Sequence, residues 1–166
     1  PYRSEGGVKY TDHHIQSPLN NVSNSCQVCH REETTELVEN VYDRQRTIVK
    51  LRDELEKQLV KAHFEAKAAW DNGAKDEQMK NILLLIRQAQ WRWDFAAAGH
   101  GSAFHAPIET GRIISEGLIR VQEARRLISK LLISLGIKDD IVIPDISSKE
   151  KAQKVIGLDM QNLEKE

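Results

Sequence analysis

The only two cysteines of the chain stand three positions apart, and a histidine directly follows the second. Cys26, Cys29 and His30 form the stretch CQVCH. This C-x-x-C-H spacing is the pattern that attaches haem of the c type. Both thiols bond covalently to the porphyrin edge, and the adjacent imidazole becomes an axial ligand of the iron. The spacing therefore predicts a haem c site on one short turn.

Other uses of a C-x-x-C pair remain open from spacing alone: a dithiol redox pair, a disulfide or half of a zinc site. A structural zinc site needs four ligands, usually with a second close pair of Cys or His. The nearest such pair, His100 and His105, lies far downstream. A thioredoxin-like pair follows a strand in a βαβ unit, and the sequence predicts no such unit. These arguments favour haem.

A haem with two histidine ligands needs one imidazole besides His30. The other histidines of the chain are His13, His14, His63, His100 and His105. His63 falls in a predicted helix, where an ordinary surface or core histidine is expected. His13 and His14 lie in an irregular arm. His100 and His105 lie in a glycine-rich break between helices, where a side chain can be aimed at a cofactor.

The elements that would position these residues are predicted to be helical. Residues 1–31 carry turn formers such as SEGG and QSPLNN and no helical period. From Glu32 to about Asp71, apolar residues recur at steps of three and four, with one step of seven, and no Pro or Gly interrupts them. This stripe consists of Leu37, Val41, Ile48, Leu51, Leu55, Leu59, Ala62, Ala66 and Ala69. Asn72-Gly73 supplies a stop.

Two more helices are expected, from Asp76 to Ala98 and from about Ile108 to Leu135, ended by Gly99 and Gly136. Ser147 and Glu150 are predicted to form a capping box for a short helix that ends at Gly157. Trp91 and Trp93 are expected in the core. The predicted fold is all-α: an elongated bundle of long helices over residues 32–166, with an irregular haem-binding arm over residues 1–31.

Composition limits the possible partners. The 166 residues fit one structural domain, and 24 Lys and Arg balance 25 Asp and Glu. Such a balance argues against nucleic acid, which favours a basic patch. The richest apolar run, Ile82 to Ile86, is too short to cross a bilayer. We therefore expect no nucleic acid partner and no membrane span.

Several longer stretches resemble one enzyme family. KYTDHH, CQVCH, QLVKAHFEAKAAWDNGA, QAQWRWDFAAAGHGSAFHAP and IPDISSKEKAQKVIGLDM are together similar to the C-terminal part of pentahaem cytochrome c nitrite reductase. The similarity runs in order over essentially all 166 residues. It implies a periplasmic enzyme with covalently attached haem, which reduces nitrite to ammonium with six electrons.

The resemblance assigns roles to individual residues. Cys26, Cys29 and His30 match the attachment motif and axial ligand of the family's fifth haem. His13 matches the distal ligand of the second haem and His105 that of the fourth, and both of these haems are attached upstream. The resemblance also implies three partners: a second copy bound through the long helices, the upstream part of the same enzyme, and a membrane or periplasmic multihaem electron donor.

Parts of the family pattern are missing. The catalytic haem of the family is held by a C-x-x-C-K motif, which this sequence lacks, and the calcium ligands of the family also lie outside this chain. The chain thus resembles a fragment without the active site, and we expect it to be inactive alone. The alternative is an independent monohaem electron carrier of the c type, in which His13 and His105 would be surplus.

Overall fold

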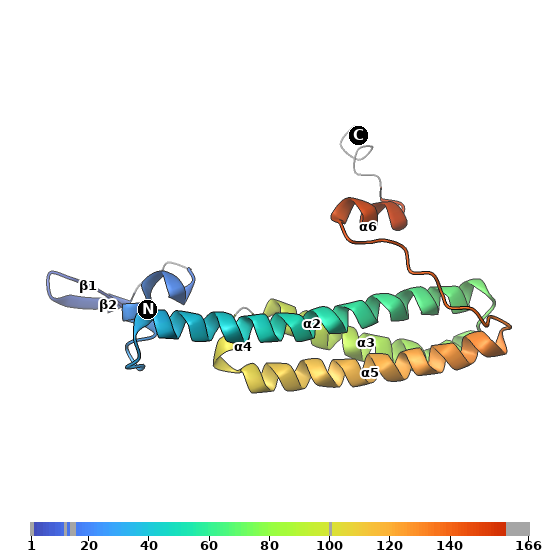
Figure 1. Cartoon of the computed structure of the whole chain (residues 1–166), viewed down its shortest axis with the longest axis horizontal. Helices are drawn as coiled ribbons and strands as arrows, with labels where there is room; N and C mark the ends of the chain where they lie inside the picture. The colour runs from blue at the N-terminus through green and yellow to red at the C-terminus, as the bar shows by residue number, and fades with distance from the viewer. Residues whose placement is uncertain (1, 12, 14–15, 100, 159–166) are drawn as a thin grey trace. The chain divides into compact units, whose positions relative to one another are not determined.

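The computed structural model describes residues 2–11, 13, 16–99 and 101–158, and most of them are helical. Three long helices dominate: α2 (Thr34–Asp71), α3 (Asp76–Ala98) and α5 (Pro107–Ser134) (Figure 1). Three short helices, α1 (Val22–Ser25), α4 (Ser102–His105) and α6 (Lys149–Val155), accompany them. The prediction of a mainly helical fold is confirmed.

The N-terminal arm contains more regular structure than its composition predicts. Strands β1 (Tyr2–Glu5) and β2 (Val8–Thr11) form an antiparallel hairpin in which Glu5 pairs with Val8. Gly6 and Gly7 both have positive φ, at 58° and 80°, as a two-residue hairpin turn requires. A 3-10 helix, η1 (Pro18–Asn21), then leads into α1. The turn formers noted in the sequence are thus the turns of ordered elements.

The chain divides into two compact units, each built from parts of the long helices. Unit 1 comprises residues 1–56 and 90–118, and unit 2 comprises residues 57–89 and 119–166. The division at residue 31 between an arm and a helical region stays a prediction.

In unit 1, the first half of α2 packs against α3 and the start of α5. Leu55 is fully buried, and a Cβ added at Gly117 of α5 would lie 2.7 Å from its Cδ2 atom and 3.4 Å from Cβ of Arg92. Gly117 therefore allows α5 to approach both α2 and α3 closely. Gly111, two turns earlier on α5, has only Ile48 within ordinary contact, at 3.9 Å.

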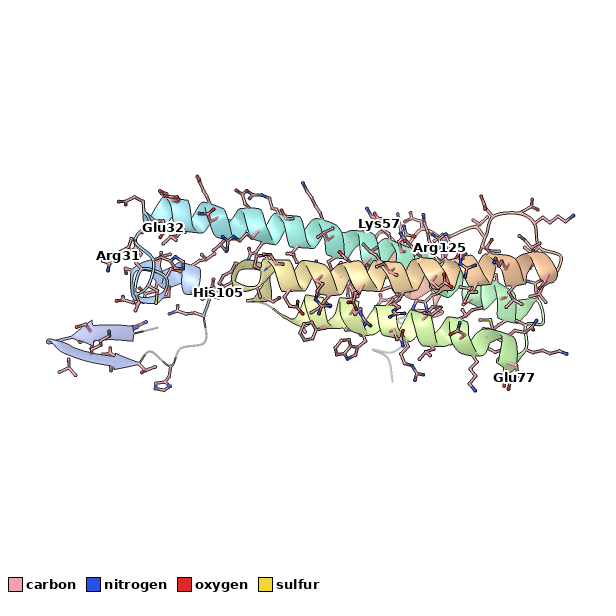
Figure 2. The ribbon with its side chains drawn as sticks, turned by 90° about the horizontal axis from the view of Figure 1, so that it is seen from below. Arg31, Glu32, Lys57, Glu77, His105 and Arg125 are labelled. Carbon is pink, nitrogen blue, oxygen red and sulfur yellow. The ribbon has the colours of Figure 1, made fainter. Side chains whose placement is uncertain are left out.

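In unit 2, the buried residues of α2 are mostly small, whereas those of α3 and α5 are mostly large. The buried residues of α2 here are Leu59, Ala62, Ala66 and Ala69. The buried large residues of α3 and α5 in this unit are Met79, Ile82, Leu85, Ile86, Val121, Ile128, Leu131 and Leu132. Arg125 of α5 bridges to α2, donating to both Glu65 oxygens and to Gln58 Oε1 at 2.6 Å (Figure 2).

Two details of the sequence prediction are wrong. The cap of α6 is Ser148, whose Oγ accepts from the Lys151 N–H at 3.3 Å, whereas Ser147 lies one residue before the cap and its N–H donates to Asp145 Oδ1. Trp91 is not in the core: it is 61% exposed and stacks on Phe95 with ring centroids 5.6 Å apart. In this part of α3 it is Ala96 that is buried, and Trp91 lies off that face.

The contrast between the two glycines of α5 gives a stability test. Gly117→Val should lower the free energy of unfolding by roughly 1–3 kcal/mol, because the added methyls overpack against buried Leu55. Gly111→Val should change it by less than about 0.5 kcal/mol, since the side chain finds space and helix propensity improves slightly. Urea denaturation measures both. Equal effects at the two positions would contradict this packing.

The start of α6 should respond to acid. The Lys151 ammonium, 2.5 Å from Asp145 Oδ2, together with Ser147 lowers the pKa of Asp145 to about 2. Because this value lies below that of the unfolded chain, the stabilisation is complete above about pH 4 and is lost as the pH falls through about 2. An NMR titration of the Ser147 amide should follow this loss. Asp145→Asn should abolish the transition, and a transition that survives would point to another group.

Candidate haem-binding site

The three residues of the attachment motif lie on one tight turn at the end of α1. The carbonyl of Cys26 accepts hydrogen bonds from the N–H of Cys29 at 3.1 Å and from the N–H of His30 at 2.9 Å. Cys26 itself continues α1, with its N–H bonded to Val22 O at 2.9 Å. Val22, the first residue of α1, is buried, so the helix that leads into this turn is anchored in the protein.

The donor groups of this turn are accessible. Both thiols are free, Cys26 is partly exposed and Cys29 is exposed. The His30 side chain is 52% exposed. Reactive thiols and an available imidazole are what covalent attachment of a porphyrin requires.

The same residues do not form a conventional metal site. Across the described parts of the chain, no three His, Cys, Asp or Glu side chains gather closely enough to hold a metal ion. Cys26, Cys29 and His30 therefore do not converge on one point. A zinc ion needs such convergence, whereas in a c-type site the thiols meet the edge of the porphyrin and the imidazole meets its iron. The donor set fits haem c.

A shallow cavity of about 100 Å³ adjoins the turn and brings together residues far apart in sequence. It is lined by Cys26 and His30 of the arm, by Glu32 just before α2, by Leu37, Asn40, Val41 and Arg44 of α2, and by Phe104 and His105 of α4. All of them belong to unit 1. His105 thus shares a cavity with His30, although the two lie 75 positions apart in the sequence.

Glu32 holds a carboxylate beside the His30 ring. Its Oε2 accepts from the Arg31 N–H at 2.9 Å and lies 3.6 Å from His30 Nδ1 (Figure 2). Backbone N–H groups of Glu32 and Arg31 hold the pKa of this carboxyl below its usual range, with a smaller contribution from His30. A negative charge at Nδ1 leaves the opposite nitrogen, Nε2, to face a metal and increases its basicity.

The structure treats the other predicted ligands differently. His13 is exposed, and among the described residues it does not line this cavity. His63 lies on the exposed face of α2, as an ordinary helix residue would. His14 and His100 lie outside the described residues.

Sequence reasoning missed Glu32, Arg44 and Phe104. Glu32 carries a local signal, since it follows the motif histidine by two positions. Arg44 and Phe104 carry none, because only the fold brings them to the cavity.

Comparison with known proteins identifies the family. A profile of the family described as "Cytochrome c552" matches residues 1–166. The chain belongs to the cytochrome c552 family. Its relatives include proteins named cytochrome c-552 from Parabacteroides distasonis, 59% identical over 160 residues, and Bacteroides thetaiotaomicron, 58% identical over 160 residues. A protein of the same name from Porphyromonas gingivalis is 54% identical over 165 residues.

The matches cover 96–99% of this chain but only 32–33% of each relative. The chain thus spans about a third of the length of the curated relatives that it matches. Membership in a family of c-type cytochromes agrees with the haem c predicted from Cys26 and Cys29. Among the helices that the structure describes, none has the length and apolar character to cross a membrane.

Glu32 offers a test that does not depend on enzymatic activity. If His30 ligates a haem attached at Cys26 and Cys29, Glu32→Gln should raise the midpoint potential of that haem in haem-loaded protein, because loss of the negative charge near Nδ1 would make His30 a weaker donor to ferric iron. Spectroelectrochemical titration measures this shift.

Glu33→Gln is the matched control, since it removes the same charge at the next position in the sequence, where no ion pair with His30 is formed. A shift as large in the control as in Glu32→Gln would show that only overall charge matters.

Proposed function

We propose that this chain is the helical, electron-transferring and dimerising part of a periplasmic multihaem cytochrome c nitrite reductase, which converts nitrite to ammonium with six electrons. The observation that carries the proposal is the joining of Cys26, His30 and His105 in one cavity. Haem c, when bound, supplies an iron that takes up and releases single electrons. The residues of this chain hold such groups and set their spacing.

Each residue has a defined part in this proposal. Cys26 and Cys29 attach one haem, and His30 is its axial ligand. His105 and His13 are the distal ligands of two other haems attached upstream of this chain. Because His105 and His30 line one cavity, the haems that they ligate would lie close together, as electron transfer between them requires.

The catalytic centre belongs, in this proposal, to the upstream part of the protein. A haem with two imidazole ligands has both axial positions filled and cannot bind nitrite. The proposal further assigns the long helices to a homodimer interface and the supply of electrons to a membrane or periplasmic multihaem donor. The calcium of the family would also lie upstream.

One observation favours a second candidate function. If His105 bound the same iron as His30, the chain would contain both ligands of one haem and could act as a monohaem electron carrier. The length of the relatives argues for the first proposal, because two thirds of each lies beyond the matched region.

The number of haems decides between the two functions. The complete protein that contains this chain, matured in a periplasm that attaches haem c, should carry five haems per polypeptide and form ammonium from nitrite. A pyridine haemochrome assay and an ammonium assay measure these quantities. One haem per polypeptide and no ammonium would establish the monohaem carrier instead.

The chain alone should not reduce nitrite. With one haem attached, its rate of ammonium formation should not exceed that of a free-haem control at equal haem concentration, since the chain contains no C-x-x-C-K motif for an open catalytic iron. Reduced methyl viologen can supply the electrons. Sustained ammonium formation above the control would contradict the assignment of catalysis to the upstream part.

A further inference from the structure

The turn that carries His105 is held by side-chain hydrogen bonds as well as by its backbone. Helix α4 has only four residues, so its carbonyls find few partners within the helix. At its start, Ser102 Oγ donates to the Gly99 carbonyl at 2.7 Å. A Cβ at Gly99 would lie 2.8 Å from that Oγ and 3.3 Å from the Phe95 carbonyl oxygen, so a larger residue here would displace the Ser102 hydroxyl.

Thr110, in the first turn of α5, contacts carbonyls at both ends of α4. This residue is only 2% exposed, and it is the one buried polar residue among the described residues. Its Oγ1 lies 2.9 Å from the Ala106 carbonyl and 3.3 Å from the Ser102 carbonyl. A buried hydroxyl is stable only with such partners, so Thr110 and α4 depend on each other.

The carbonyl of Phe104, the residue before His105, accepts a hydrogen bond from a residue far away in the sequence. Arg44, on α2, donates from Nη1 to the Phe104 carbonyl at 2.9 Å, across 60 residues of sequence. The Phe104 ring in turn packs on the His105 imidazole, with centroids 4.3 Å apart and planes tilted by 51°. Arg44 therefore holds the backbone of Phe104, whose ring contacts the His105 imidazole.

Arg44 also lines the cavity that contains Cys26, His30 and His105. Its hydrogen bond joins α2, which forms one wall of that cavity, to α4, which carries the imidazole. Arginine suits this position because its guanidinium is always charged and offers several donors in a fixed plane. A charged donor also binds a carbonyl more strongly than a neutral one does.

We infer that Arg44 is a positioning residue for His105: its guanidinium holds the Phe104 carbonyl and thereby keeps the imidazole at the cavity shared with Cys26 and His30. This hydrogen bond from Arg44 to the Phe104 carbonyl, here called the tether, belongs to the folded chain without haem. Its consequence for iron rests on the proposed function, in which His105 is a haem ligand.

Arg46 provides a matched control. It lies two residues further along α2 and is likewise exposed, but its guanidinium pairs locally with Asp43. Arg46→Gln therefore removes the same charge from the same helix without touching α4. Arg44→Lys keeps the charge but loses the planar set of donors, so it should still hold the Phe104 carbonyl in part.

The first measurement is hydrogen exchange on the chain without haem. In Arg44→Gln, the amides of His105 and Ala106 should exchange about twofold to tenfold faster, the change expected for one lost hydrogen bond of ordinary strength. The Thr110 amide, bonded to Ala106 O and held by its own buried side chain, should change less. Arg46→Gln should leave all three as in the parent chain. Unchanged exchange in Arg44→Gln would overturn the inference, whatever the haem content proves to be.

The second measurement uses the complete haem-loaded protein. Arg44→Gln should produce a high-spin ferric signal in its electron paramagnetic resonance spectrum, and added imidazole should remove that signal by replacing the misplaced ligand. Arg44→Lys should give a weaker signal and Arg46→Gln none. Faster exchange together with this rescued signal supports both the tether and the ligand role. Faster exchange with an unchanged spin state supports the hydrogen bond from Arg44 to Phe104 but overturns the inference that it is needed to keep His105 on iron. A high-spin signal that imidazole does not remove counts against His105 as the displaced ligand.

Discussion

The candidate site depends on one backbone carbonyl, that of Cys26. It accepts hydrogen bonds from both Cys29 and His30, and these two bonds fold the motif into a single turn. The turn carries the two thiols and the imidazole. It directly follows α1, whose first residue, Val22, is buried and fixes the start of that helix. Without these two hydrogen bonds the motif would not be held as a turn, and the positions of the two thiols and the imidazole relative to one another would not be fixed.

The helices contribute by surrounding that turn with fixed groups. The first half of α2 supplies Leu37, Val41 and Arg44 to the cavity, while α4 supplies Phe104 and His105. Close packing at Gly117 and Leu55 and the buried hydroxyl of Thr110 keep these elements in register within unit 1. The cavity is thus a product of helix packing, although its chemically active residues come mainly from short or irregular segments.

The sequence predicted the parts of this structure that depend on local rules. The helix from Asp76 to Ala98 is observed with those bounds, and the uninterrupted stripe before Asn72-Gly73 became α2. The motif Cys26, Cys29, His30 was visible from spacing alone, whereas the assignment of His105 came from the family resemblance. The cap of α6 was predicted one residue early because the adjacent Ser147 and Ser148 are both suitable N-cap residues, and only the structure shows that the Lys151 N–H donates to Ser148 Oγ. The Arg44 to Phe104 contact was beyond prediction, since it joins residues 60 positions apart.

The unequal exposure of the two thiols affects how they react before a cofactor is attached. Cys29 is open to solvent and Cys26 is partly covered, so an oxidant can reach the first more easily than the second. Two neighbouring thiols in an oxidising compartment tend toward a disulfide, which would consume the groups needed for thioether bonds. Under the proposed function, attachment of the porphyrin therefore competes with oxidation of the thiols. The exposure that would let a large planar molecule approach the thiols would also let an oxidant approach them, so in that proposal the thiols have to stay reduced until the thioether bonds form.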